Sequence, residues 1–432
     1  MRIKPIIDTA FKFLFSKTNN VKLKNIILGL AFSMVPVIIV LIVSEGMIFG
    51  ITQRFIEINS YHYQIKKHFS FSEEQFESVK ALLAENNKVT GIFREKRGEG
   101  LLNFNKSISG VSVRGVEKSF YKNDPKLREF LKLKQGNFDL SDDRNIILSA
   151  DLAEEMDIKV GDKLKLLTTK PTEGRPPILR PNTFIVSAIV YSGYYDLDNL
   201  TVYMSYEKAV RLFPDNQSII GVKVKNPSKE DAEFEEYLDE KLNLGWYYVY
   251  WKKINALMYS SFASTESTLL IIMSIIIIVA AVNIFSALVM LTMEKSREIA
   301  IMKSTGISNN DIVVLFSFMS VVIGIIGTFA GIAIGLFLGI NINPVISIIE
   351  YFINSIIFLI NILITPFSND IAVRDVKILN PSYYLEKIPV IIDFAKLTIF
   401  CSFAIFLSFL AGFIPGIKAS KRKPVEIIAK HI

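Results

Sequence analysis

The chain has 432 residues, of which 50% are hydrophobic, and its mean hydropathy is positive. This composition excludes a single soluble domain and indicates a membrane protein with a large water-soluble insertion. The net charge of +7 does not indicate nucleic-acid binding, because the lysines and arginines gather beside the apolar stretches. The single cysteine, Cys401, lies in an apolar stretch, so the sequence offers no internal disulfide and no cysteine-rich metal site.

Four stretches lack charged residues over the roughly 20 residues that a helix needs to cross a bilayer. They lie at about 25–44, 267–292, 312–340 and 397–417. The first is longer than the apolar core of a signal peptide, and no small-residue cleavage pattern follows it, so we expect a retained span. The basic segments beside these stretches all fall on one side, which the positive-inside rule places in the cytoplasm together with both termini.

These stretches divide the chain into predicted segments. The cytoplasmic ones are 1–24, a coupling segment at 293–311 and a tail at 418–432. The spans are 25–48, 267–292, 312–340 and 395–417, and the extracytoplasmic parts are 49–266 and 341–394. The predicted fold is therefore an α-helical membrane bundle of four transmembrane helices, with a large α+β domain inserted between the first and the second.

The insertion at 49–266 shows the alternation of an α+β domain. Runs rich in β-branched and aromatic residues predict strands at 111–116, 145–148, 163–167, 183–190 and 200–204. An N-cap residue followed by acids in the first turn predicts a helix at 72–85, and we expect short helices between the strands at 151–155, 206–212 and 229–242. We find no nucleophile-elbow, zinc-protease or P-loop pattern, so an ATPase that drives this chain would be another protein.

One predicted loop of the insertion, at 170–181, is rich in proline. Proline fixes φ and restricts the unfolded chain, so such a loop can project as a stiff arm. Protein recognition and a merely long, rigid connection both remain open on these residues. The candidate residues of this arm are Lys170, Pro171, Arg175, Pro176, Pro177, Arg180 and Pro181.

A short charged segment, residues 293–308, lies between the second and third spans. A charged helix cannot lie in hydrocarbon, so this segment must sit at a membrane surface. Its length suits a coupling element on which a soluble motor pushes.

Glycines recur nearly every fourth residue in the third span, where small residues allow helix backbones to approach closely. The stripe fits either contact with a partner permease or packing inside the chain's own bundle. Its members are Gly324, Gly327, Gly331, Gly335 and Gly339.

A fifth apolar stretch, at about 344–364, would place the basic tail outside if it crossed the membrane. Its polar residues form one narrow stripe, so we expect an amphipathic helix that lies in the outer interface. The stripe consists of Asn343, Ser347, Glu350, Asn354 and Asn361.

Across almost its whole length the chain resembles the LolC/LolE family of lipoprotein-releasing ABC transporter permeases, within the wider MacB/FtsX-like permeases. The likeness begins with the order of parts: one span, a large outer domain, then three spans. It continues in short motifs whose order and spacing match the family. These motifs lie at 109–116, 145–153 with 160–163, 184–196, 251–255, 380–389 and 414–426.

In that family the permeases pair, two ATPases dock beneath them, and ATP turnover lifts a triacylated lipoprotein out of the inner membrane. The resemblance implies a non-catalytic permease in the inner membrane of a two-membrane bacterium, with no cofactor of its own and with ATP and magnesium held by the partner ATPase. The implied partners are a LolD-like ATPase dimer, a second LolC/LolE-like permease in a hetero- or homodimer, a LolA-like periplasmic carrier, the lipoprotein and membrane lipid. Nucleic acid is not among them.

The resemblance also assigns residues. Those that couple to the ATPase would be Glu294, Lys295, Arg297, Glu298, Met302 and Gly306, while Ile299 and Ile301 would pack against the bundle. The lipoprotein acyl chains would meet Met34, Val37, Met47, Phe262 and Met273, each of which also fits the bundle core. The arm at 170–181 falls where LolC-like members grip the carrier.

Two other functions remain open. One is a MacB-like exporter of periplasmic peptides or toxins. The other is an FtsX-like transmitter that moves nothing and activates a cell-wall hydrolase. The insertion at 49–266 is larger than FtsX-type proteins usually carry, which counts against the transmitter.

Overall fold

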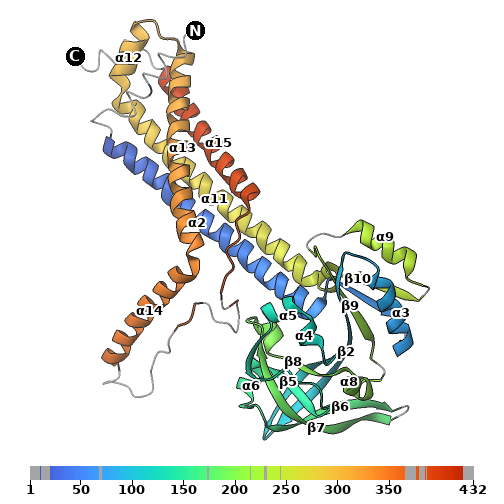
Figure 1. Cartoon of the computed structure of the whole chain (residues 1–432). Coiled ribbons are helices and arrows are strands. Elements are labelled where there is room, and N and C mark those ends of the chain that lie inside the picture. Colours follow the sequence, from blue (N-terminus) through green and yellow to red (C-terminus); the bar gives the residue numbers. More distant parts are fainter. Residues whose placement is uncertain are drawn as a thin grey trace. The chain divides into compact units, whose positions relative to one another are not determined.

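The structure is a computed structural model. It describes residues 10, 20–67, 71–172, 175–214, 216–227, 231–243, 245–364, 376–378, 385 and 387–421. The chain divides into two compact units (Figure 1). Unit 1 comprises Met1–Ile48, Ser261–Val376 and Ile388–Ile432, and unit 2 comprises Phe49–Ser260 and Lys377–Lys387.

Long apolar helices make up unit 1. They are α2 (Asn20–Arg54, whose end lies in unit 2), α11 (Ala256–Glu294, whose start lies in unit 2), α13 (Asn309–Ile340), α14 (Ile342–Ile364) and α15 (Phe394–Ser420), with the short α12 (Ser296–Ser304) between α11 and α13. Among the described residues, five segments are long and apolar enough to cross a membrane. Each predicted span therefore lies in a helix, and the fifth stretch is also a helix. The count of four crossings stays a prediction.

The core of unit 1 is formed by apolar side chains from α2, α11, α13 and α15, together with Ile299 of α12. The glycine stripe of α13 lies against the chain's own helices. A Cβ placed on Gly331 would come within 2.5 Å of the Met34 Cβ, and one on Gly324 within 2.5 Å of the Ser408 Cβ. Packing within the bundle is therefore the role that the structure gives this stripe.

The glycine contacts also fix helix directions. Along α13, Gly327, Gly331, Gly335 and Gly339 meet Leu30, Met34, Ile38 and Ile42 of α2 in the same order, so the two helices run parallel. Against α15 the order reverses: Gly324 meets Ser408, whereas Gly412 and Gly416 of α15 meet Ser320 and Phe316. The helices α13 and α15 are therefore antiparallel neighbours.

Unit 2 is built on one sheet, which confirms the α+β class of the insertion. The sheet order is β10-β1-β9-β2-β3-β8-β5-β7-β4, and β6 pairs with β2 and β7. The strands are β1 (Tyr63–Lys67), β2 (Val89–Phe104), β3 (Ser107–Val116), β4 (Lys132–Gly136), β5 (Asn145–Ser149), β6 (Lys163–Thr172), β7 (Arg175–Tyr191), β8 (Thr201–Ser205), β9 (Ser218–Val224) and β10 (Trp246–Tyr250).

Short helices complete unit 2. They are η1, a π-helix at Phe55–Ser60, and α3 (Glu73–Ala84), α4 (Phe120–Asn123), α5 (Pro125–Phe130), α6 (Ala150–Glu155), α7 (Tyr195–Asp198), α8 (Tyr206–Leu212), α9 (Ala232–Lys241) and α10 (Trp251–Ile254). The predicted helix at 72–85 is confirmed as α3, whose N-cap Ser72 forms a capping box with Gln75. The predictions at 151–155, 206–212 and 229–242 correspond to α6, α8 and α9.

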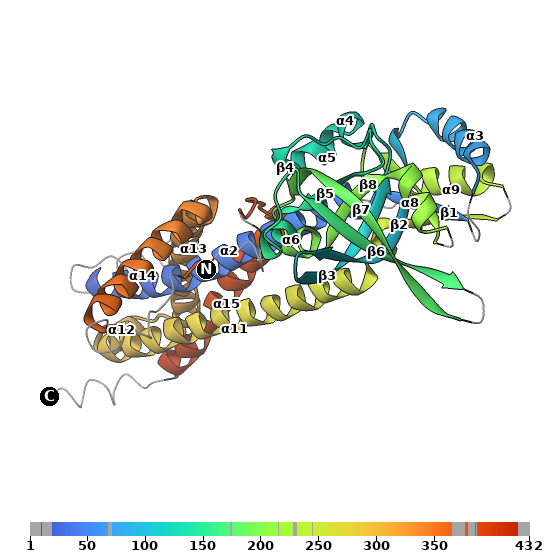
Figure 2. The same ribbon diagram turned by 90° about the horizontal axis from the view of Figure 1, so that it is seen from below.

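The proline-rich segment at 170–181 was predicted as a loop, and here the structure differs. Its described residues belong to a hairpin of β6 and β7, in which Lys170 pairs with Ile178 and Thr172 with Arg175 (Figure 2). Contact of β6 with β2 ends at Leu167, so beyond this point β6 pairs with β7 alone. Proline is tolerated there because an edge strand does not need every backbone N–H.

Candidate functional site

The predicted coupling segment forms α12. Lys295 is its N-cap residue, and the Lys295 Nζ donates to the Glu298 Oε1 at 2.5 Å. The helix ends where Ile307 N donates to Met302 O at 3.2 Å and Gly306 takes a φ of +97°. Glycine suits this left-handed position because it has no Cβ to clash. The sequence therefore specifies a short helix with defined ends between two long ones.

One face of α12 is exposed and the other is buried. Glu294, Arg297, Glu298 and Gly306 are exposed and Lys295 is half-buried. The prediction that Ile301 packs against the bundle is wrong, because its side chain is 50% exposed. Three positions separate it from Glu298, so a helix places both on one face.

Three contacts hold α12 against the other helices of unit 1. Ile299 is buried in the core, and Met302, predicted at the ATPase surface, packs partly against that core. In addition, Lys303 Nζ donates to the carbonyl oxygen of Ser420, at the end of α15, at 2.6 Å. A force on the exposed face of α12 would therefore reach α15 as well as α11 and α13. Sequence reasoning missed Lys303 because its partner lies 117 residues away.

The residues predicted to meet acyl chains divide into two groups. Met34, Val37 and Met273 are buried in the core of unit 1. Met47 and Phe262 are half-buried. Met34, Val37 and Met273 therefore lie in the bundle core of this chain. Their contact with acyl chains stays a prediction.

A charged cluster joins three helices of unit 1. Lys396 of α15 forms ion pairs with Glu45 of α2 and Glu266 of α11, and all three side chains are half-buried. The two ion pairs therefore link three helices of unit 1. In the sequence this cluster is visible only as three charges at span boundaries.

The residues of the proposed arm lie in the β6–β7 hairpin. Arg180 and Pro181 are exposed. The side chains of Lys170, Pro171, Arg175, Pro176 and Pro177 lie outside the described set, although their backbones belong to the two strands.

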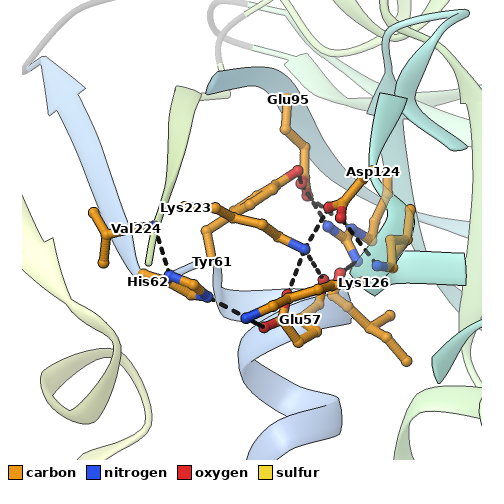
Figure 3. A network of polar contacts seen from close by, with 11 residues as sticks. Glu57, Tyr61, His62, Glu95, Asp124, Lys126, Lys223 and Val224 are labelled. Carbon is orange, nitrogen blue, oxygen red and sulfur yellow. Dashed lines mark hydrogen bonds and ion pairs between the residues drawn. The ribbon is translucent and has the colours of Figure 1, made fainter. Parts of the chain in front are cut away.

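A buried polar network surrounds η1 in unit 2 (Figure 3). Successive carbonyl oxygens of this helical turn accept hydrogen bonds from side chains of four different strands. The pairs are Glu57 with Lys223 of β9 at 3.0 Å, Ile58 with Arg114 of β3, Asn59 with Arg97 of β2, and Ser60 with Gln64 of β1 at 2.9 Å. The last carbonyls of a helix have no partner within it, and cationic groups also complement its dipole. The sheet therefore caps the end of η1.

Carboxylates neutralise the cations that cap η1. Lys223 Nζ lies 2.7 Å from the Glu57 carboxylate and also pairs with Asp124. Figure 3 shows Lys223 between these two side chains, with Lys126 on the other side of Glu57. Each carboxylate is buried, so removal of Lys223 would leave uncompensated charge.

His62 is held by both ring nitrogens. Val224 N donates to Nδ1 at 2.7 Å, so Nδ1 must be unprotonated, and Nε2 lies 3.3 Å from the Glu57 Oε1. This arrangement fits a neutral imidazole that donates from Nε2 to the carboxylate. Burial lowers the pKa of His62, against the opposing effect of Glu57. The ring is therefore a structural link, and no sequence pattern predicted it.

Glu95 forms the second half of the network. Its carboxylate accepts from Arg114 Nη2 at 2.6 Å and Nε at 2.9 Å, from Arg97 Nε at 2.7 Å and from the Tyr61 hydroxyl at 2.6 Å. Burial raises the pKa of Glu95, but the charges of Arg114 and Arg97 outweigh it and lower the pKa to about 2. Its acceptor positions are all occupied by protein, so the group serves to hold η1 and not to react.

Comparison with known proteins agrees with this architecture. The family model of the MacB-like periplasmic core domain matches residues 26–238, and that of the FtsX-like permease C-terminal region matches residues 270–424. The lipoprotein-releasing system transmembrane protein LolC of Neisseria meningitidis is 26% identical over 74% of this chain and 73% of its own. LolC of Xylella fastidiosa is 28% identical over 69% of this chain and 68% of its own. LolE of Haemophilus influenzae is 23% identical over 94% of this chain and 93% of its own.

The two family models together describe a chain with a MacB-like periplasmic core domain and an FtsX-like permease C-terminal region, and several of its described helices are long and apolar enough to cross a membrane. Within that class the chain is similar to the lipoprotein-releasing transmembrane proteins LolC and LolE.

Proposed function

We propose that the chain is the permease subunit of an ABC transporter that extracts lipoproteins from the inner membrane and hands them to a periplasmic carrier for sorting to the outer membrane. The observation that supports this most directly is the similarity to lipoprotein-releasing LolC and LolE over up to 94% of the chain. The subunit is non-catalytic. It pairs with a second LolC/LolE-like permease, and a LolD-like ATPase dimer holds the ATP and magnesium.

The exposed face of α12 is the proposed surface for the ATPase. Arg297 and Glu298 offer charge, and Ile301 and Met293, 50% and 60% exposed, offer apolar area beside it. ATP binding would close the ATPase pair and displace α12. The contacts of Ile299 and Lys303 would pass that displacement to the bundle, where the acyl chains are squeezed outward.

A protected transfer to the carrier follows from the energetics. Exposure of acyl chains to water costs about 0.8 kcal/mol per CH₂, which amounts to tens of kcal/mol for three chains. One ATP cycle cannot supply that, so the chains must pass directly into a hydrophobic carrier. The β6–β7 hairpin is the proposed surface that holds the carrier, and exposed Arg180 contributes positive charge to it.

The coupling role is tested with Glu298→Lys in the reconstituted complex. We expect ATP turnover to continue while lipoprotein release falls, because the reversed charge misaligns α12 on the ATPase. Glu240→Lys is the matched control, an exposed acid of α9 with the same charge change. Normal release by Glu298→Lys would contradict the coupling role.

Co-purification with mass spectrometry separates the candidate functions. An ATPase together with acylated lipoprotein supports lipoprotein release. An ATPase with a wall hydrolase and no lipoprotein would favour the FtsX-like transmitter.

A variant in which a short turn joins Thr168 to Arg180 removes the outer hairpin and keeps the β6–β2 pairing, and we expect it to lose carrier binding.

A further inference from the structure

Helix α14 carries a polar stripe, and two of its asparagines bond to the backbone of later residues of the same chain. Asn343 Nδ2 donates to the carbonyl oxygen of Ile388 at 2.9 Å, and its Oδ1 accepts from Ile388 N at 3.0 Å. Asn354 makes the same pair with Val376, at 3.1 and 2.8 Å. Because the earlier asparagine meets the later residue, the returning chain runs antiparallel to α14.

These two pairs satisfy polar groups without water. Each asparagine amide gives one donor and one acceptor to a backbone N–H and C=O of the returning chain. Extended backbone is tolerated at membrane depth only where protein satisfies its hydrogen bonds. The stripe that predicted an interfacial helix is thus turned toward the returning chain at both asparagines.

The opposite side of α14 is broadly apolar and exposed. At 100° per residue the exposed apolar positions cover roughly 200° of the circumference, against roughly 60° for the polar stripe. Ser355 lies within this arc, and its hydroxyl donates to Tyr351 O at 2.7 Å. The large exposed residues are Ile348, Ile349, Tyr351, Phe352, Ile356, Phe358, Leu359 and Ile360.

Composition identifies what covers this arc. Glu350 is the sole charged residue between Ile342 and Ile364, whereas helices that lie half in water carry a strongly charged face. Contacts between membrane helices favour small residues, as the α13 glycines show, and the exposed apolar positions of α14 hold bulky side chains. Hydrocarbon is the environment that fits both observations.

We propose that α14 is immersed in the acyl-chain region of the outer leaflet and that its apolar arc is a lipid-binding surface, while Val376 and Ile388 bond to two asparagines of its polar stripe. The helix adds no crossing, because α13 before it and α15 after it pack antiparallel. It leaves the end of α13 at a sharp bend (Figure 1), as a helix that turns into the leaflet must. This proposal rests on α14 alone and does not depend on lipoprotein release.

Nitroxide labels on the full chain in phosphatidylethanolamine–phosphatidylglycerol vesicles test the proposal. Cys401→Ala removes the single native cysteine, and Phe352→Cys or Leu359→Cys places a label on the arc. Collisions with oxygen report lipid, and collisions with a water-soluble nickel chelate report water. Phe406→Cys on α15, at a side chain 56% exposed, is the lipid control, and Glu240→Cys on α9 is the water control.

We expect labels at 352 and 359 to match the label at 406, with frequent oxygen collisions and a loss of nickel collisions relative to 240. Frequent nickel collisions at 352 would place the arc in water and overturn the proposal. Few collisions with either probe would mean that protein covers the arc, which also overturns it. Failure of lipoprotein release in the same vesicles would not alter these readings.

Discussion

At the scale of residues, side chains of the sheet hold the capped turn η1 in place. Four strands each supply one side chain to one carbonyl of this turn, and buried Glu57 and Glu95 hold the cations in place. Unpaired buried charge is strongly destabilising, so loss of one partner should affect the whole network. The turn η1 follows α2 directly in the chain, and the network holds η1 to the sheet within unit 2.

The pKa of Glu95 predicts acid sensitivity of unit 2. Its carboxyl has a pKa of about 2 in the folded state against 4.5 as the ordinary value. A lowered pKa gives stability that is fully present above pH 4.5 and is lost as the pH falls toward 2. The loss amounts to roughly 3 kcal/mol at about 1.4 kcal/mol per pKa unit.

Tryptophan fluorescence measures this loss in the intact chain, because Trp246 and Trp251 are its only tryptophans and both lie in unit 2. We expect the thermal midpoint to decrease as the pH is lowered from 4.5 to 2. The Glu95→Gln variant should be less stable at pH 7, and its thermal midpoint should depend less on pH across this range. An equally steep acid dependence in Glu95→Gln would assign the effect to other groups.

The sequence did not predict this network, and the reason is physical. Lys223 and Glu57 are 166 residues apart, and Arg114 and Glu95 are 19 apart on neighbouring strands. Local periodicity carries no information about such partners. The sequence did predict α3, whose start is encoded within four residues by the Ser72–Gln75 capping box.

At the scale of elements, the glycine stripe of α13 sets how closely it approaches α2. A Cβ on Gly331 would meet the Met34 Cβ at 2.5 Å and the Ala31 carbonyl oxygen at 2.9 Å, atoms that no rotamer change can move away. The spacing of the glycines predicted a close approach between helices. It did not say whether the neighbour is a partner permease or a helix of the chain's own bundle. Only the tertiary arrangement identifies the chain's own helix as the neighbour.

Gly331→Ala should therefore destabilise the bundle by roughly 1–3 kcal/mol, the usual range for overpacking. Gly29→Ala is the matched control, since nothing lies within 4 Å of its added Cβ. Both changes raise helix propensity equally, so their difference isolates the contact. Helical circular dichroism during titration of detergent micelles with dodecyl sulfate gives the two midpoints. Equal midpoints would mean that α2 and α13 are not in close contact.

The fold class was accessible from sequence because apolar length and β-branched runs are local signals. The sequence analysis did not predict the strands β1, β2, β4, β9 and β10. The last of these has the sequence Trp-Tyr-Tyr-Val-Tyr and lies between two helices. The full length of the β6–β7 hairpin was not predicted either, because prolines argue against a strand unless its edge position is already known.

At the scale of the whole molecule, helix directions bear on the number of crossings. The helices α2 and α13 run parallel, while α13 and α15 run antiparallel. If α14 crossed the membrane between them, α15 would have to run parallel to α13. Four crossings with both termini in the cytoplasm satisfy the helix directions and the positive-inside rule together.

Labelling of single cysteines with an impermeant maleimide tests this topology, in a Cys401→Ala background. Cysteines at Glu240 and Lys387 should react in intact spheroplasts, because four crossings place both outside. Cysteines at Ser304 and Lys421 should react only after permeabilisation. All four side chains are exposed, so a failure to react reports the membrane and not burial in the fold. A fifth crossing by α14 would reverse the result at Lys421 while leaving Ser304 protected, and that pattern would refute the four-crossing topology.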